Sequence, residues 1–159
     1  MQDSLRTGLT FGLTSAAITT MGLMVGLNSG TGSKMVVLGG ILTIAIADAF
    51  SDALGIHISE ESENVHTFKE VWVATGVTFL TKCLFALTFA VPVVYFSLTT
   101  AVIINIIWGL FILSVMSYLI ARSQDQQPWK IIGEHLLIAV VVIAITNYVG
   151  NLIGKMGGA

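Results

Sequence analysis

Stretches with few or no charged residues alternate with short polar breaks along the chain. Three of them cover 7–33, 35–58 and 131–153, and the longest, 71–121, contains a single charged residue, Lys82. An α-helix rises about 1.5 Å per residue, so about 20 mostly apolar residues cross the hydrocarbon core of a bilayer. Each stretch is therefore long enough to span a membrane at least once.

The segment 71–121 is too long for one crossing, so the chain has to turn inside it. Pro92 lacks a backbone donor and bends a helix, and the polar residues within 96–100 favour a turn after it. The pattern predicts five transmembrane helices, at 7–29, 35–58, 71–95, 101–121 and 131–153.

The composition agrees with a membrane-embedded chain. Of 159 residues 55% are hydrophobic and 10% are charged, and the mean hydropathy is +0.89. Soluble domains carry about 25% charged residues. A β-barrel would need alternating polar and apolar positions, which the uninterrupted apolar run 136–145 lacks. We therefore predict an all-α integral membrane protein with one transmembrane domain, 1–159, in a prokaryotic cell membrane.

Charge sets the expected orientation and excludes one class of partner. The net charge of −2 gives no basic surface for nucleic acid. Cytoplasmic loops carry the excess of Lys and Arg. If the N-terminus is cytoplasmic, Arg6, Lys69, Arg122 and Lys130 lie inside, and only two basic residues lie outside. The first apolar stretch is longer than the roughly 7 to 15 residues of a signal-peptide core, so we expect it to remain as a span.

Two aspartates fall inside the second predicted span. Asp48 lies about 16 Å and Asp52 about 10 Å from the span end near Ser59. A carboxylate at that depth costs about 2.5 to 3.5 kcal/mol on insertion scales, so each needs a partner or a wet cavity. We interpret both as candidate functional residues.

The acids continue as a stripe if this helix extends to Glu70. At about 100° per residue the stripe is about 80° wide, and it consists of Asp48, Asp52, Gly55, Ser59, Glu63, His66 and Glu70. Oxygen ligands with an imidazole suit a divalent first-row transition metal. We predict that Glu63, His66 and Glu70 gather such an ion at the surface and that the aspartates bind it at depth.

Two further readings concern the neighbouring spans. Met21 and Met24 lie one turn apart, and their thioethers are candidate ligands for a borderline metal, although core packing explains them too. Lys82 lies at the depth of Asp48 on the next antiparallel span, so an Asp48–Lys82 ion pair of purely structural purpose is an open alternative. Asp52 would then lack a partner within the chain, which favours it as the functional acid.

The segments 47–59 (ADAFSDALGIHIS), 11–26 (FGLTSAAITTMGLMVG) and 144–148 (AITNY) together resemble the vacuolar iron transporter family. The resemblance covers most of the chain and implies five spans and a homodimer. It also implies transport of iron(II) at a site repeated across the dimer axis, where Met21 and Met24 would contribute. The family's first-span aspartate corresponds here to Ser15, its second-span methionine to Asp52, and the glutamate that follows to Ile56. The acidic cytoplasmic insert of eukaryotic members is absent from this sequence.

These observations lead to one functional hypothesis and one rival. The first is a transporter that exports iron(II) or manganese(II) from the cytoplasm in exchange for protons, with no permanently bound cofactor. Two adjacent carboxylates hold a shared proton until a cation displaces it. The rival is a membrane scaffold or metal sensor of the same fold that transports nothing. No phosphate-binding loop, HExxH or GxSxG motif is present, so we do not expect an enzyme.

Overall fold

The computed structural model describes residues 1–157, and within this range it contains helices and no strand. Five helical segments of the described chain are long and apolar enough to cross a membrane, which confirms the all-α class and fits a multi-pass membrane protein. The helices are α1 (Gln2–Thr31), α2 (Lys34–Ser62), α3 (Phe68–Thr88), α4 (Ala90–Tyr95), α5 (Leu98–Ser123) and α6 (Pro128–Gly157), and α3 and α4 together form the third span.

Short polar breaks start and stop these helices. Gly32 ends α1 in the left-handed conformation (φ 58°), which glycine adopts without steric cost. Ser33 begins α2 by accepting a hydrogen bond from the backbone N–H of Val36, and Ser97 begins α5 in the same way. The predicted turn after Pro92 is confirmed, because α4 ends at Tyr95 and α5 begins at Leu98.

The second helix, α2, ends before Glu70, whereas the predicted acidic stripe needs one helix that continues to that residue. α2 ends at Ser62, the chain turns with Asn64 at φ 54°, and α3 begins after Thr67. Thr67 and Glu70 form a capping box, in which each side chain binds the other residue's backbone N–H. One helix from Met35 to Glu70 was therefore a wrong prediction, because local capping starts a new helix where periodicity alone suggested continuity.

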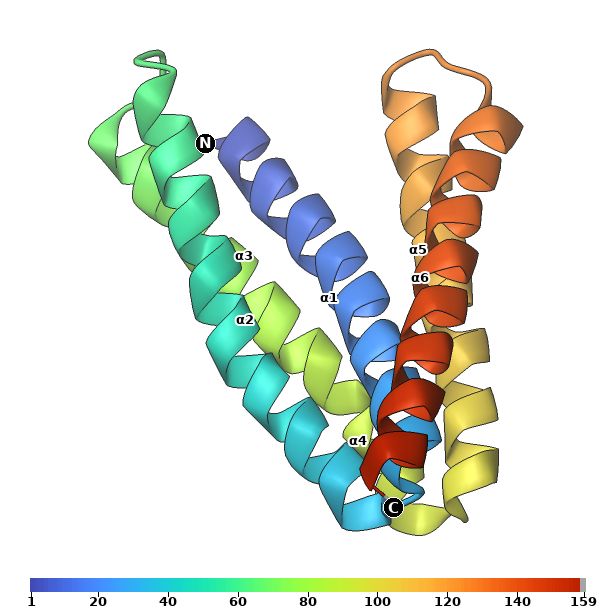
Figure 1. Cartoon of the computed structure of the whole chain (residues 1–159). Helices are drawn as coiled ribbons and strands as arrows, with labels where there is room; N and C mark the ends of the chain where they lie inside the picture. Colours follow the sequence, from blue (N-terminus) through green and yellow to red (C-terminus); the bar gives the residue numbers. More distant parts are fainter. Residues whose placement is uncertain (158–159) are drawn as a thin grey trace.

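α1 is the central helix, packed on α3 along one side and on α6 along another (Figure 1). Glycines allow both approaches: an added Cβ at Gly8 would lie 2.7 Å from the Ala74 carbonyl oxygen of α3, and one at Gly30 would lie 3.1 Å from that of Gly150 on α6. α2 and α3 lie on one side of α1, and α5 and α6 diverge from them toward the N-terminal end (Figure 1). These glycines therefore serve helix packing within the chain.

The break between α3 and α4 is held by a buried amide. Asn105 of α5 is fully buried, and its Nδ2 donates to the carbonyl oxygen of Phe89 at 2.8 Å. Phe89 is the junction residue between α3 and α4. Pro92 has no N–H to give to the carbonyl of Thr88, four residues earlier, so the regular helical bonding is interrupted at this junction. Asn105 binds the next carbonyl, that of Phe89, and holds α5 against the bend.

Candidate functional site

A buried lysine joins three helices near the middle of the third candidate span. Lys82 of α3 is 1% exposed, and its Nζ lies 2.6 Å from Oδ2 of Asp48 and forms an ion pair with Oδ2 of Asp52, both on α2. The same Nζ donates to Oγ of Ser15 on α1 at 2.9 Å, and Ser15 Oγ in turn donates to Asp52 Oδ2 at 2.6 Å. We call Ser15, Asp48, Asp52 and Lys82 the carboxylate–lysine cluster.

Helix geometry explains why these four residues meet. Asp48 and Asp52 are four residues apart, so their side chains share one face of α2. On α1, an added Cβ at Gly12 would lie 3.1 Å from the carbonyl oxygen of Thr78 and 3.3 Å from the backbone nitrogen of Lys82. This close backbone approach brings the next turn of α1, with Ser15, against the ammonium group. The cluster thus depends on a small residue one turn away.

The charges of the cluster do not balance. Two carboxylates share one ammonium, which leaves a net charge of −1 when all three groups are ionised. The lysine is sealed, whereas the side chains of Asp48 and Asp52 are 27% and 20% exposed. Buried ion pairs repay the loss of hydration only with good geometry and extra hydrogen bonds. The excess carboxylate gives the site capacity for a proton or a cation.

One prediction about these acids is confirmed and one is wrong. The Asp48–Lys82 pair, an open alternative from the sequence, is present. The expectation that Asp52 lacks a partner is wrong, because Asp52 pairs with the same lysine and with Ser15. Sequence reasoning treated Ser15 only as a lost aspartate. The structure places this hydroxyl in contact with both Asp52 and Lys82.

The surface residues of the predicted stripe separate into two groups. His66 Nε2 lies 3.4 Å from Oε2 of Glu60 and 3.6 Å from Oε2 of Glu63. Glu70 belongs to α3, where it caps the helix and binds the N-terminal amine of Met1 at 2.5 Å. Within residues 1–157, no group of three or more His, Cys, Asp or Glu side chains is arranged to hold a metal ion. Glu60, which the sequence analysis passed over, is 8% exposed and faces His66.

The two methionines lie in the core against α5. Met21 and Met24 are fully buried, and the sulfur of Met21 occupies the space beside Gly109 that a Cβ would take. The sulfur of Met24 accepts from Asn105 Nδ2 at 3.2 Å. Both side chains therefore contact α5, whereas the carboxylate–lysine cluster is built from α1, α2 and α3.

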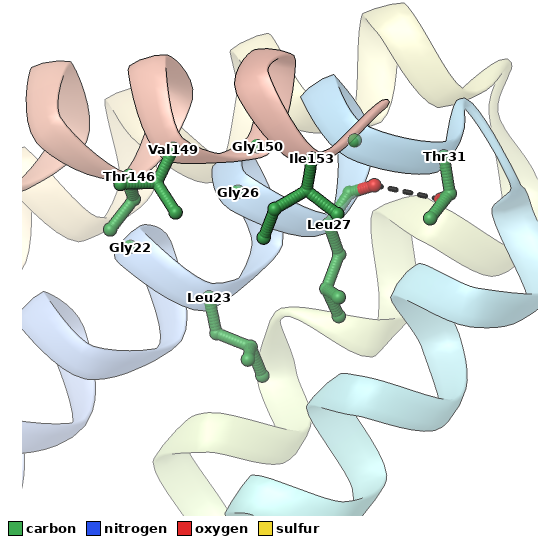
Figure 2. Close-up of a pocket in the computed structure, with 10 residues that line it drawn as sticks. Gly22, Leu23, Gly26, Leu27, Thr31, Thr146, Val149, Gly150 and Ile153 are labelled. Carbon is green, nitrogen blue, oxygen red and sulfur yellow. Dashed lines mark hydrogen bonds between the residues drawn. The ribbon is translucent and has the colours of Figure 1, made fainter. Parts of the chain in front are cut away.

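Open space adjoins the cluster. A groove of about 660 Å³ between α1 and α2 reaches Asp48, and its wall on α2 contains Gly40, Thr43, Ile44, Ala47, Asp48 and Ser51. A different groove, of about 300 Å³ between α1 and α6, is lined by glycines and aliphatic side chains around Gly26 and Gly150 (Figure 2). Only the first brings a titratable group to its surface.

Comparisons of this chain with models of protein families, with curated proteins and with solved structures found no match. The functional argument therefore rests on the chemistry of the cluster and the space around it.

Proposed function

We propose that this chain is a membrane transporter that exports a divalent cation, manganese(II) or iron(II), from the cytoplasm in exchange for protons. The carboxylate–lysine cluster is the binding site. The observation that carries this proposal is that two partly exposed carboxylates share one sealed ammonium beside an open groove. Such a site has an unmet negative charge, and the groove leads from Asp48 toward Val36, at the end of α2 that lies outside the cytoplasm when the N-terminus is inside.

Charge balance explains the coupling to protons. In the resting state the Lys82 ammonium occupies the position between Asp48 and Asp52 that a cation would take. A divalent ion bound by both carboxylates leaves no negative charge to stabilise the ammonium, so Lys82 releases a proton as the ion binds. On the other side of the membrane the proton returns and expels the ion. Proton and cation then compete for the same carboxylates.

The donor atoms favour a hard ion. The cluster offers two carboxylates and the Ser15 hydroxyl. Carboxylate and hydroxyl oxygens suit manganese(II) well, whereas sulfur ligands favour softer metals. Met21 and Met24 contact α5 instead of this cluster. Manganese(II) is therefore the first ion to test, and iron(II) the second.

The proposal includes a homodimer with the N-terminus in the cytoplasm, which the resemblance to vacuolar iron transporters and the distribution of basic loop residues support. A second copy has a place to bind. The outward face of α2 beside Asp48 presents small side chains, Thr43, Ala47 and Ser51, which are exposed in the single chain. Small residues let transmembrane helices approach closely.

The alternative function is a membrane scaffold that transports nothing. Lys82 contacts Ser15, Asp48 and Asp52 at once, so the cluster could serve only to hold α1, α2 and α3 together. In that case the charges are a structural lock, and any exchange of cations for the ammonium would unfold the bundle.

Cation flux into proteoliposomes distinguishes the transporter from the scaffold. Purified protein in vesicles with an opposing proton gradient should take up manganese(II), and Asp52→Asn should abolish uptake while leaving the oligomer and its melting temperature near those of the wild type. Asp125→Asn, in the exposed loop between α5 and α6, is the matched control and should transport normally. Wild-type vesicles that accumulate no cation, or an Asp52→Asn variant with full flux, would refute the proposal.

A further inference from the structure

A further groove, with a polar mouth, opens at the N-terminal end of the bundle, apart from the one beside Asp48. Its deep part, of about 450 Å³, lies among α1, α2, α5 and α6 and is mostly apolar. Three threonines and one histidine supply its polar atoms, and the full lining is Thr7, Thr10, Phe11, Thr14, Ile18, Ile56, Leu113, Ile120 and His135. Its mouth, of about 420 Å³, is lined by charged and polar side chains such as Asp3, Arg6, Ser123 and Gln124. Thr7, Thr10 and Ile120 line both parts, so the groove is continuous.

His135 of α6 lines the deep part of this groove and is bonded to α5. Its Nδ1 lies 2.7 Å from Oγ of Ser117 on α5, and Ser117 Oγ donates its only hydrogen to the carbonyl oxygen of Leu113 at 2.6 Å. With the Ser117 hydrogen on Leu113, Ser117 accepts from His135, and we assign the proton of the neutral ring to Nδ1 on this basis. Nε2 is left with a free lone pair.

The α1 side of the groove also presents acceptors. Thr10 Oγ1 donates to the carbonyl oxygen of Arg6 at 2.7 Å, and Thr14 Oγ1 donates to that of Thr10 at 2.7 Å. With their hydrogens used within the helix, both hydroxyls offer oxygen lone pairs to the groove. The hydroxyl oxygens of Thr10 and Thr14, together with the imidazole of His135, can hold water molecules that transfer protons.

The groove also leads toward the cluster. Ile56, in its lining, is one helical turn from Asp52 on α2, and Thr14 immediately precedes Ser15 on α1. Along the helices, the groove therefore ends within about one turn of Ser15 on α1 and of Asp52 on α2.

We propose that this groove is a water-filled vestibule in which Nε2 of His135 accepts protons and exchanges them between the water at the N-terminal end and the carboxylate–lysine cluster. The step is a proton transfer alone: Nε2 gains a proton to form the imidazolium and loses it to water. The direction, outward from Lys82 when a cation binds from the cytoplasm, rests on the proposed function. The hydration of the groove and the acceptance of protons by His135 do not depend on the proposed function.

The charged groups around His135 are few. Asp3 and Arg6 of α1 lie at the mouth, and Glu134, its neighbour on α6, is exposed. α5 and α2 contribute Ser117 and Ile56, which carry no charge.

Nitrogen NMR of the full chain in lipid nanodiscs tests this directly. The chain has three histidines, so single His→Gln variants assign every signal. His135 should carry its neutral-state proton on Nδ1, and its Nε2 signal should move from the unprotonated to the protonated range as the buffer is acidified between about pH 8 and pH 5.

His57 is the matched control. Its Nδ1 lies 2.9 Å from Oγ1 of Thr75, which donates to the carbonyl oxygen of Val71, so its ring is held in the same way. Its surroundings differ: an apolar groove with Phe50, Trp72 and Phe79 on the outer side of α2 and α3. The His57 signal should stay unchanged over the same pH range. A His135 signal that does not move, a proton on its Nε2, or equal responses from both rings would overturn the proposal.

A second measurement tests the link to transport. In proteoliposomes His135→Gln should lower the rate of proton-coupled manganese(II) flux by about 100-fold, while the affinity for manganese(II) stays that of the wild type. His57→Gln should leave the rate unchanged. Unaltered flux in His135→Gln would contradict the proton-transfer role. If the wild type itself moves no cation, the proposed function fails, and the NMR experiment still decides whether His135 meets water.

Discussion

The ammonium of Lys82 lies 2.6 Å from Oδ2 of Asp48 and also pairs with Asp52, so one cation serves two acids of the neighbouring helix. This relationship makes Lys82 both the stabiliser of the cluster and the group that an incoming ion has to displace. The removal of the lysine should therefore destabilise the protein, whereas the removal of one acid should leave its stability near that of the wild type.

Lys82→Met should destabilise the protein strongly. The variant leaves Asp48 and Asp52 facing each other without a counter-charge, and the removal of one partner from a buried ion pair costs about 3 to 5 kcal/mol. Lys155→Met, near the exposed end of α6, should change little. Thermal unfolding of both variants in the same detergent measures the difference. Equal melting temperatures would show that Lys82 does not hold the cluster together.

Asp48→Asn should fold and yet lose its cation. One carboxylate and the lysine remain as a balanced pair, and Ser15 still donates to Asp52. With the excess negative charge gone, the site no longer favours a divalent ion, and binding of manganese(II) should fall below detection by titration calorimetry. If this variant binds manganese(II) as the wild type does, the ion is held elsewhere.

Gly150→Ala should separate α1 from α6. The added Cβ would overlap the carbonyl oxygen of Gly26, which belongs to the backbone and cannot move aside. Overpacking of this kind costs about 1 to 3 kcal/mol. Gly133→Ala, on the same helix with no heavy atom within 4 Å of the new methyl, is the control and should be neutral or slightly stabilising. The ranking of their unfolding temperatures checks the packing.

Asn105→Ala should weaken the bend between α3 and α4. The change leaves the carbonyl oxygen of Phe89 without the amide that it now accepts from, at a cost of about 1 to 3 kcal/mol. Asn151→Ala is the comparison, because the Asn151 amide is exposed and donates only within its own helix. Hydrogen exchange at residues 89–96 reports the effect. Equal protection in the two variants would contradict this role for Asn105.

The sequence predicted the spans because a bilayer of fixed thickness selects long apolar stretches. It also predicted the depth match of Asp48 and Lys82, which follows from counting residues along antiparallel helices. It did not predict that α2 ends at Ser62. That end depends on the turn at Asn64 and on the reciprocal hydrogen bonds of Thr67 and Glu70, which compete locally with a helical periodicity that continues through them.

The sequence also did not predict which residues form the carboxylate–lysine cluster. Whether Asp52 pairs with Lys82 depends on the rotation of α2 against α3, and the contact of Ser15 depends on how closely Gly12 lets α1 approach. From sequence, Met21 and Met24 were candidate metal ligands with core packing favoured over that role, and their contacts with Gly109 and Asn105 place them in the core against α5. His135 and Ser117 are isolated polar residues in sequence, and only the packing of α5 on α6 joins them.

The most direct measurement counts the protons that leave when the ion binds. Manganese(II) added to the purified wild-type protein in weakly buffered detergent solution should release about one proton per chain, because binding to the carboxylates forces the lysine to give up its charge. Asp48→Asn should release none. Saturable binding of manganese(II) to the wild type without any proton release would contradict the exchange of a cation for the Lys82 proton.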